Sequence, residues 1–252
     1  MHPLDYPWFS KDSIPAPQKM EISHKGKRIL VTGGSRGIGK KICDTFTRAG
    51  GNVISVNSKD FDFSTKEGLA SFLDYIKTIG KIDILVNNAA YNFEQSVGEL
   101  SEAEFDKLML VNVKTPFFVT KEVSKVMKQN GYGRIINIAS IAANRVKRGR
   151  SAYSASKASL ITFTRVIASE LAEYGILCNS VSPGFTLTEM TTKMLSKEQI
   201  DKHTEQVPLK KLADVEDIAN IVSYLSSDLN KFITGQDIVV DGGFTNSIFI
   251  KN

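Results

Sequence analysis

The stretch Thr32-Gly33-Gly34-Ser35-Arg36-Gly37-Ile38-Gly39 follows a short apolar run and leads directly into a helical pattern. Glycines at this point allow a tight turn, and the start of the helix presents free N–H groups to a phosphate. A strand, a glycine-rich turn and a helix in this order are typical of dinucleotide-binding folds. Glycine spacing alone is a weak signal, so its meaning depends on the surrounding pattern.

Outward from this turn, β-branched runs alternate with amphipathic segments. The expected strands are Arg28–Thr32, Asn52–Asn57, Ile82–Asn87, Arg134–Ala139, Leu177–Ser182 and Asp237–Val240. The expected helices are Ile38–Ala49, Glu67–Ile79, Glu102–Lys128, Tyr153–Glu173 and Val215–Leu225. This alternation predicts one α/β domain: a Rossmann-like, doubly wound parallel sheet covered by helices on both faces. We place the domain over residues 26–252 and an N-terminal extension over residues 1–25, where four prolines disfavour regular structure.

Composition excludes several classes of protein. No apolar run reaches the roughly 18 residues of a membrane span, and the N-terminus lacks a secretory signal pattern, so we expect a cytoplasmic protein. The net charge of +5 is mild and favours anionic ligands over nucleic acid. The two cysteines and three histidines are scattered, so we expect no metal site.

Several motifs together resemble the short-chain dehydrogenase/reductase family. Its glycine loop TGxxxGxG, its NNAG segment, its post-strand turn and its C-terminal strand end are matched by Thr32–Gly39, Asn87–Ala90, Pro183–Gly184 and Asp241–Gly243. Its catalytic tetrad is matched in order and spacing by Asn112, Ser140, Tyr153 and Lys157. The resemblance covers residues 26–245 and is nearest to 3-oxoacyl-carrier-protein reductases. It implies an oxidoreductase that moves a hydride between a nicotinamide cofactor and a carbonyl or secondary alcohol.

Tyr153 and Lys157 are four residues apart, so they share one face of a helix. A nearby ammonium lowers the pKa of a tyrosine, so we expect Tyr153 to be the acid/base and Lys157 its electrostatic partner. Ser140 ends a strand, and its hydroxyl can hold a substrate carbonyl oxygen. Pro116 has no N–H for the carbonyl of Asn112, so we expect a helix kink there. The resemblance implies that this carbonyl holds a water that relays protons to the lysine.

The cofactor is expected to be NADP(H), with NAD(H) as an alternative. No acid stands at Asn57 or Ser58, whereas Lys59 and Arg36 can bind a 2′-phosphate. The family's helix between its second and third strands has no room here, so we expect a direct crossing to a short third strand near Asp62. The resemblance assigns the cofactor to Gly33, Ser35, Arg36, Gly37, Ile38, Gly39, Asn57, Ser58, Lys59, Asp62, Phe63, Asn88, Ala89, Ala90, Tyr153, Lys157, Pro183, Gly184, Thr186 and Thr188.

The substrate side is less defined. Residues 142–151 hold the densest basic cluster of the chain, which is either a dock for an anionic carrier or a solvated loop or subunit contact. The predicted substrate contacts are Ala142, Arg145, Arg148 and Phe185. The resemblance implies a lid over residues 191–206 and a further contribution from residues 92–97.

The leading hypothesis is an NADPH-dependent 3-oxoacyl-type reductase. An NAD(P)-dependent sugar, polyol or nucleotide-sugar dehydrogenase is the enzymatic alternative, and a dinucleotide-binding sensor or scaffold is the non-enzymatic one. The resemblance also implies a homodimer or homotetramer built by the long helices over 102–128 and 153–173.

Overall fold

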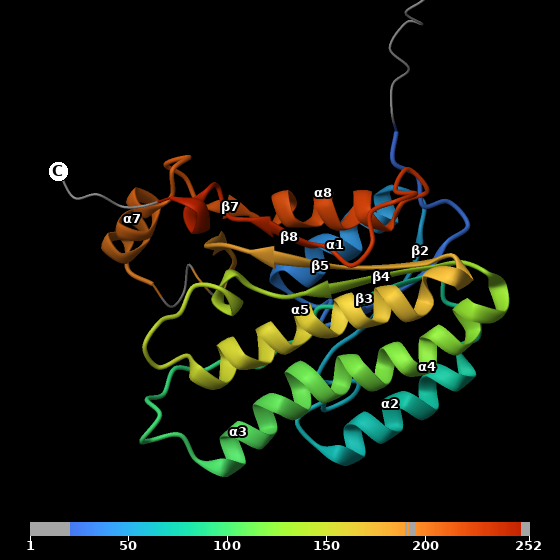
Figure 1. The fold of residues 1–252 in the computed structure, drawn as a ribbon, viewed down its shortest axis with the longest axis horizontal. Coiled ribbons are helices and arrows are strands. Elements are labelled where there is room, and N and C mark those ends of the chain that lie inside the picture. The colour runs from blue at the N-terminus through green and yellow to red at the C-terminus, as the bar shows by residue number, and fades with distance from the viewer. Residues whose placement is uncertain (1–20, 190, 192–194, 248–252) are drawn as a thin grey trace, which may run out of the picture.

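The computed structural model describes residues 21–189, 191 and 195–247. The strands are β1 (Arg28–Thr32), β2 (Asn52–Val56), β3 (Ile84–Asn87), β4 (Gly133–Ile138), β5 (Ile176–Pro183), β6 (Thr186–Leu187), β7 (Ala213–Asp214) and β8 (Asp237–Val240). The α-helices are α1 (Gly37–Arg48), α2 (Lys66–Thr78), α3 (Glu102–Met109), α4 (Thr115–Asn130), α5 (Ser151–Leu171), α7 (Lys197–Gln206) and α8 (Val215–Ser226). Figure 1 shows how these elements are arranged.

The main sheet has six parallel strands in the order β2-β1-β3-β4-β5-β8. Strands β1, β3 and β4 are almost entirely buried, which explains the apolar segments Ile29–Val31, Ile84–Val86 and Ile135–Ile136 at their centres. The chain reverses its direction of winding between β1 and β3, and ligands of such sheets bind at this point, beyond the carboxyl ends of the strands. The predicted Rossmann-like fold is confirmed.

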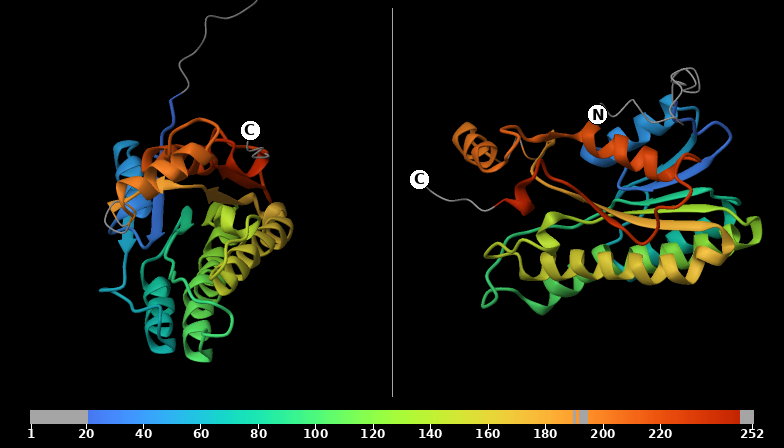
Figure 2. Two further views of the ribbon diagram at one scale, coloured as in Figure 1. Left: turned by 90° about the vertical axis from the view of Figure 1, so that its left-hand side faces the viewer. Right: turned by 45° about the horizontal axis from the view of Figure 1, so that its top comes forward.

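Helices cover both faces of the sheet (Figures 1 and 2). On one face, α1 and α8 pack Phe46 and Val222 against the sheet. On the other, α2, α4 and α5 contribute Phe72, Met127 and Leu171 to a second core cluster. The two apolar layers hold the strands rigidly, so that side chains at their carboxyl ends have fixed positions.

The crossing from β2 to α2 contains turns and no strand. The family's helix is missing here, as predicted, but the predicted short third strand is wrong. Asp60 accepts bonds from the Asn57 backbone N–H at 2.9 Å and side-chain amide at 2.7 Å. Asp62 accepts from the Ser64 N–H and hydroxyl at 2.9 and 2.7 Å. These local bonds hold the backbone in turns instead of a ladder.

The helix expected over 102–128 is interrupted at Leu110–Lys114 by a π-helical turn. The Thr115 N–H bonds the Leu110 carbonyl, five residues back. Pro116 supplies the reason, because it has no N–H for the carbonyl four residues before it, that of Asn112. The expected kink is thus a π-helical turn, a feature frequent at functional sites.

A pair of two-residue strands lies apart from the main sheet. Thr186 and Leu187 of β6 pair in parallel with Ala213 and Asp214 of β7. The Ala213 N–H also donates to the Phe185 carbonyl at 3.0 Å. This small ladder brings together the two ends of the segment that contains α7.

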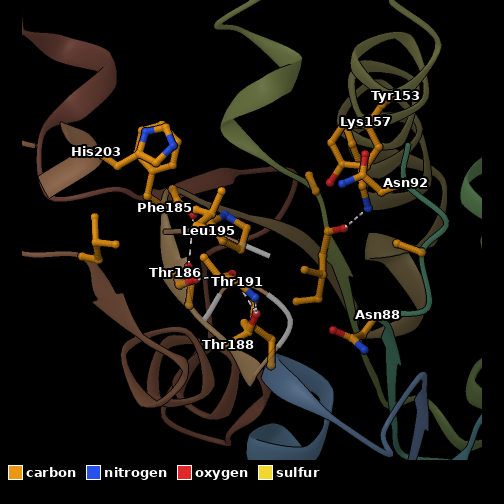
Figure 3. Close-up of a pocket in the computed structure, with 17 residues that line it drawn as sticks. Asn88, Asn92, Tyr153, Lys157, Phe185, Thr186, Thr188, Thr191, Leu195 and His203 are labelled. Atoms are coloured by element: carbon orange, nitrogen blue, oxygen red, sulfur yellow. Dashed lines mark hydrogen bonds between the residues drawn. The ribbon is translucent and has the colours of Figure 1, made fainter. Parts of the chain in front are cut away.

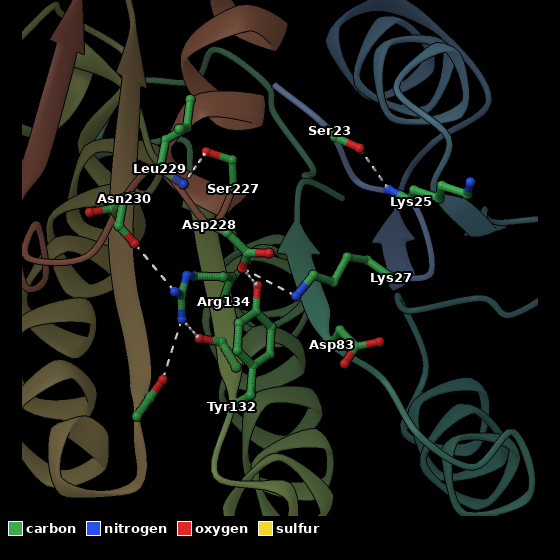
Figure 4. A network of polar contacts seen from close by, with 12 residues as sticks. Ser23, Lys25, Lys27, Asp83, Tyr132, Arg134, Ser227, Asp228, Leu229 and Asn230 are labelled. Atoms are coloured by element: carbon green, nitrogen blue, oxygen red, sulfur yellow. Dashed lines mark hydrogen bonds and ion pairs between the residues drawn. The ribbon is translucent and has the colours of Figure 1, made fainter. Parts of the chain in front are cut away.

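The amino end of the sheet is closed by a polar cluster (Figure 4). The Tyr132 ring lies 3.8 Å from Lys27 Nζ and 4.5 Å from the Arg134 guanidinium carbon. The Tyr132 hydroxyl donates to Asp228 at 2.9 Å, and Lys27 pairs with the same carboxylate at 3.1 Å. The cluster ties the starts of β1 and β4 to the segment after α8, and it lies at the end of the sheet opposite the expected site.

The N-terminal segment packs onto the domain before residue 26. His24 is fully buried, its Nε2 lies 2.9 Å from the Ser223 hydroxyl, and its ring meets Phe46 edge-on at 4.7 Å. Burial lowers the pKa of His24 to about 4. Residues 1–20 of the predicted extension lie outside the described residues. Within the described part of the chain, no helix is long and apolar enough to cross a membrane.

Candidate active site

A cavity of about 350 Å³ opens at the carboxyl ends of the central strands (Figure 3). One wall carries Tyr153, Lys157 and Asn88, and the other carries Phe185 and His203. Among the described residues, the lining consists of Ile38, Asn88, Ala90, Asn92, Ile138, Ala139, Tyr153, Lys157, Pro183, Gly184, Phe185, Thr186, Thr188, Thr191, Leu195, His203 and Leu212. The cavity therefore brings together the start of α1 and the predicted reaction centre.

The glycine loop fits closely against the end of β3. A Cβ on Gly39 would lie 2.2 Å from the Gly33 carbonyl oxygen, so only glycine is accepted there. Gly33 itself has φ +69°, a conformation that favours glycine. The Asn88 side-chain amide donates to the carbonyls of Thr32 and Gly33 at 3.0 and 2.9 Å. Asn88 thus acts as a brace that holds the loop in shape.

The start of α1 suits the pyrophosphate of a dinucleotide. Its N-cap residue, Arg36, makes no side-chain capping bond, whereas Thr65 and Ser101 cap α2 and α3. Uncapped N–H groups at a helix start bind anions, and Ile38 in this first turn lines the cavity. The residues at this end of the cavity therefore fit a nicotinamide dinucleotide.

The residues predicted to bind the adenosine half of the cofactor lie in the turns after β2. Asn57, predicted as a ribose contact, uses its side chain inside its own turn, where it bonds Asp60. The sequence reasoning passed over Asp60, which brings a carboxylate to the end of β2. Phe63 is buried against Phe72, with ring centroids 5.1 Å apart, so its side chain belongs to the core. None of the predicted residues from Asn57 to Phe63 lines the cavity.

The turn after β5 lies beside the glycine loop. A Cβ on Gly37 would lie 3.7 Å from the Thr188 side chain. The Thr191 hydroxyl donates to the Thr186 carbonyl at 3.0 Å and lies 2.9 Å from the Thr188 hydroxyl. The Thr186 hydroxyl donates to the Gly184 carbonyl at 3.1 Å, so its side chain stabilises the turn.

Lys157 is buried on the inner face of α5, with 2% of its surface exposed. Its Nζ donates to the Ile138 carbonyl at 2.8 Å and lies 5.7 Å from the centroid of the Tyr153 ring. Burial lowers the pKa of Lys157 to about 8, because desolvation disfavours the ammonium. The side chain therefore remains charged at neutral pH and can lose its proton slightly above it.

Tyr153 has a pKa above its usual value, and the expected lowering by Lys157 is wrong for this state of the protein. Burial raises the pKa of Tyr153, while a hydrogen bond with Ser140 and the charge of Arg150 act against this rise. Lys157 turns its ammonium to the Ile138 carbonyl. The groups that favour the phenolate are thus Ser140 and Arg150.

Asn112 is buried next to the site, and its side chain has a structural task. Its Oδ1 accepts from the Tyr91 N–H at 2.8 Å, and its Nδ2 donates to the Tyr91 carbonyl at 2.9 Å. Nδ2 also lies 3.1 Å from the Ser156 hydroxyl on α5. The side chain thus ties the π-helical turn to α5 and to the segment after β3.

A buried polar ladder aligns the central elements beneath the cavity. The Asn87 side chain donates to Asn137 at 2.8 Å and to Thr120 at 3.1 Å. Asn137 donates in turn to the Thr164 hydroxyl at 2.8 Å. The ladder links β3, β4, α4 and α5, because each buried amide needs its partner.

The substrate side contains two residues that were not predicted individually. His203 of α7 stacks on Phe185 with ring centroids 4.2 Å apart, and its buried Nδ1 has no hydrogen-bond partner among the described residues. Asn92 lies near Tyr153 on the opposite wall (Figure 3). Both fall within segments that the sequence associates with the substrate, but a lone histidine in a polar segment carries no signal of its own.

The basic loop is partly neutralised. Lys147 and Arg150 both pair with Glu94, at 3.0 and 3.4 Å. The Arg145 guanidinium bonds the Thr245 carbonyl. Of the four predicted substrate contacts only Phe185 lines the cavity, while Ala142, Arg145 and Arg148 lie outside its lining.

Fold and site together define a dinucleotide-dependent oxidoreductase. The family model described as enoyl-(acyl carrier protein) reductase matches residues 60–245. The chain belongs to the short-chain dehydrogenase/reductase family, as its motifs predicted, and it is an NAD(P)-dependent oxidoreductase that acts on CH–OH groups.

Named relatives align over most of this chain. The 3-oxoacyl-(acyl-carrier-protein) reductase of Aquifex aeolicus is 34% identical over 247 residues, covering 89% of this chain and 99% of the relative. The acetoacetyl-CoA reductase of Cupriavidus necator is 34% identical over 236 residues, covering 84% and 96%. A putative NAD(P)-dependent gluconate 5-dehydrogenase from Beutenbergia cavernae with bound NADP superimposes with a TM-score of 0.85 at 28% identity, covering 90% of this chain and 99% of that one.

Proposed function

We propose that this chain is an NADPH-dependent reductase of 3-oxoacyl thioesters. The proposal rests on one observation: Tyr153, Lys157 and Ile38 of the glycine loop line the same cavity. The substrate class is supported by relatives at 34% identity that are named as 3-oxoacyl-(acyl-carrier-protein) and acetoacetyl-CoA reductases.

The reacting groups have separate tasks. When bound, the nicotinamide supplies or accepts the hydride. Ser140 holds the substrate oxygen and Tyr153 passes it a proton. Lys157 is charged at neutral pH, binds the ribose hydroxyls and receives protons through a water held by the carbonyl of Asn112. This carbonyl lies in the π-helical turn, where Pro116 has no N–H to offer it.

Residues 33–39 would hold the pyrophosphate of the cofactor and residues 183–188 its nicotinamide. The segment Asn88–Ala90, at the end of β3, would contact it as well. Arg36 and Lys59 select NADPH, because both are exposed near the adenosine end and the nearby Asp60 carboxylate is engaged by Asn57. This engagement reduces the repulsion that a free carboxylate would exert on a 2′-phosphate.

A second candidate is a sugar-acid dehydrogenase. The gluconate 5-dehydrogenase from Burkholderia cenocepacia, in complex with NADP and tartrate, superimposes with a TM-score of 0.82 at 25% identity, covering 90% of this chain and 98% of that one. The polar side chains of Asn92 and His203 in the cavity favour a hydroxylated substrate.

The test is a cofactor-by-substrate activity panel on the purified protein. Oxidation of NADPH or NADH is followed by absorbance with acetoacetyl-CoA, an acetoacetyl-carrier protein and 5-ketogluconate, with Tyr153→Phe as the inactive control. We expect kcat/KM to be highest for a thioester with NADPH. Turnover of 5-ketogluconate alone would favour the second candidate, and equal kcat/KM with both cofactors would refute the NADPH preference.

We also propose that the protein is cytoplasmic and forms a homodimer or homotetramer through α4 and α5. Phe117 on α4 is 45% exposed and packs against Phe163 of α5 at 5.2 Å, which leaves apolar surface for a second copy. Arg145 and Arg148 would contact an anionic carrier at the cavity mouth. Sedimentation velocity tests the assembly, and a single monomeric species would refute it.

A further inference from the structure

Arg150 lies beside Tyr153 of the proposed reaction centre. It directly precedes α5, and its guanidinium carbon lies 5.8 Å from the centroid of the Tyr153 ring. The Arg150 side chain is 25% exposed, so water screens its charge only in part. None of the roles proposed above uses this residue.

Two loops hold the guanidinium in place. Arg150 donates to the Asn92 side-chain oxygen, and its Nη2 lies 3.4 Å from Glu94 Oε2. The Gln95 N–H donates to the Gly149 carbonyl at 3.0 Å, which joins the loop after β3 to the loop before α5. A Cβ on Gly149 would lie 2.8 Å from Glu94 Cγ, so glycine permits this close approach. Figure 3 shows Asn92 close to Tyr153 and Lys157.

The charges in this cluster do not cancel. Glu94 is shared by Arg150 and by Lys147, which pairs with the same oxygen at 3.0 Å, so one positive charge is left over. Lys147 is 65% exposed and strongly screened, whereas Arg150 lies against the tyrosine. The other titratable groups near Tyr153 are Lys157, which points its ammonium to a backbone carbonyl, and His203 across the cavity. Arg150 is therefore a second cation beside Lys157, since the two lie 5.8 and 5.7 Å from the centroid of the Tyr153 ring.

We propose that Arg150 is a positioning residue for the reaction: Asn92 and Glu94 fix its guanidinium so that a permanent positive charge favours the ionised hydroxyl of Tyr153. The inference rests on the proposed proton-transfer role of Tyr153 and adds a second cation to Lys157. It agrees with the finding that the charge of Arg150 lowers the pKa of Tyr153 against the effect of burial. An arginine suits this task because it keeps its charge at every pH at which an enzyme works.

The direct test is a titration of Tyr153 by NMR in protein labelled with ¹³C at the tyrosine Cζ, where the Tyr153 signal is assigned by its loss in Tyr153→Phe. We expect Arg150→Gln to raise the midpoint by about one pH unit, because a charge at this distance is partly screened. Arg150→Lys keeps the positive charge but lacks the planar guanidinium that Asn92 and Glu94 hold, so the Tyr153 midpoint should rise by about half a pH unit. Lys147→Gln is the matched control, since it removes one positive charge from the same cluster at a side chain that is 65% exposed, so the Tyr153 midpoint should move much less than in Arg150→Gln.

The pH profile of kcat/KM gives a second measurement, with whichever carbonyl substrate the protein reduces. The limb assigned to Tyr153 should move to higher pH by the same amount in Arg150→Gln. If no substrate is reduced, the proposed function fails while the NMR titration still decides the inference. An unchanged midpoint in Arg150→Gln, or an equal shift in Lys147→Gln, overturns the proposal. A higher KM in Arg150→Gln with an unchanged limb in the pH profile also overturns the proposal, because Arg150 would then be a substrate contact. Should Arg150→Gln not fold, an unchanged midpoint in Arg150→Lys overturns it equally.

Discussion

The buried histidine before β1 makes stability depend on pH in a way that the structure quantifies. Burial lowers the pKa of His24 from 6.5 to about 4, against the opposing effects of the Asp228 charge and the Ser223 hydrogen bond. Between these two pH values the unfolded chain binds a proton that the folded chain does not. Stability is therefore fully present above pH 6.5 and is lost as the pH falls towards 4.

The size of the effect follows from the pKa difference. A shift of about 2.5 units corresponds to about 3.4 kcal/mol below both transitions, of which about 2 kcal/mol is already lost at pH 5. His24→Gln keeps a neutral polar side chain and should remove this loss. Between pH 7.5 and pH 5.0, the wild type should thus lose about 2 kcal/mol more unfolding free energy than the variant.

Urea unfolding followed by circular dichroism at the two pH values measures the difference, at one fixed protein concentration because assembly also affects stability. Ser223→Ala is the control, because it removes the hydrogen-bond partner but leaves the imidazole buried, so the pH dependence should persist. If His24→Gln loses as much stability as the wild type between pH 7.5 and 5.0, the burial argument is wrong.

Three further changes test the site and its support. Tyr153→Phe should lower kcat by about 10²- to 10⁴-fold while the Kd for NADPH, measured by fluorescence, changes by less than about threefold; near-normal turnover contradicts the acid/base role. Gly39→Val should weaken NADPH binding by more than about tenfold, since a Cβ meets the Gly33 carbonyl at 2.2 Å; unchanged calorimetric affinity refutes this. Asn137→Ala should lower the unfolding free energy in urea by about 1–3 kcal/mol because it removes two buried hydrogen bonds, those with Asn87 and Thr164, and no change would mean that the ladder is dispensable.

The main sheet could be predicted because the apolar residues of its strands follow one another in the local sequence. Parallel strands buried on both faces are rich in apolar residues, as in Ile29–Val31 of β1, and the predicted bounds of β1 and β8 match the structure. Strands β6 and β7 have two residues each and are held by pairing between distant segments, so no run of residues marks them. A short strand was predicted near Asp62, where the structure has a turn, because side-chain bonds to the backbone are not visible in a hydrophobic pattern.

Motifs predicted that the glycine loop, Tyr153 and Lys157 lie together, and the structure brings Ile38 of this loop, Tyr153 and Lys157 to one cavity. Charge pairing and burial were not predictable, because they depend on partners far away in the chain. Lys147 belongs to the basic cluster, and its partner Glu94 stands 53 residues earlier. The pKa of Tyr153 is raised by burial, which only the packed structure reveals.

The small β6–β7 ladder has a consequence for how this enzyme can change over evolution. Because β6 pairs with β7, the segment between Leu187 and Ala213 is a loop whose two ends are held together. The entropy of closing a loop grows slowly, by about 0.6 kcal/mol for each doubling of its length. Leu195 and His203 lie inside this loop, whereas Tyr153 lies on α5. Changes within this one segment can therefore reshape part of the cavity lining while Tyr153 and Lys157 keep their places on α5.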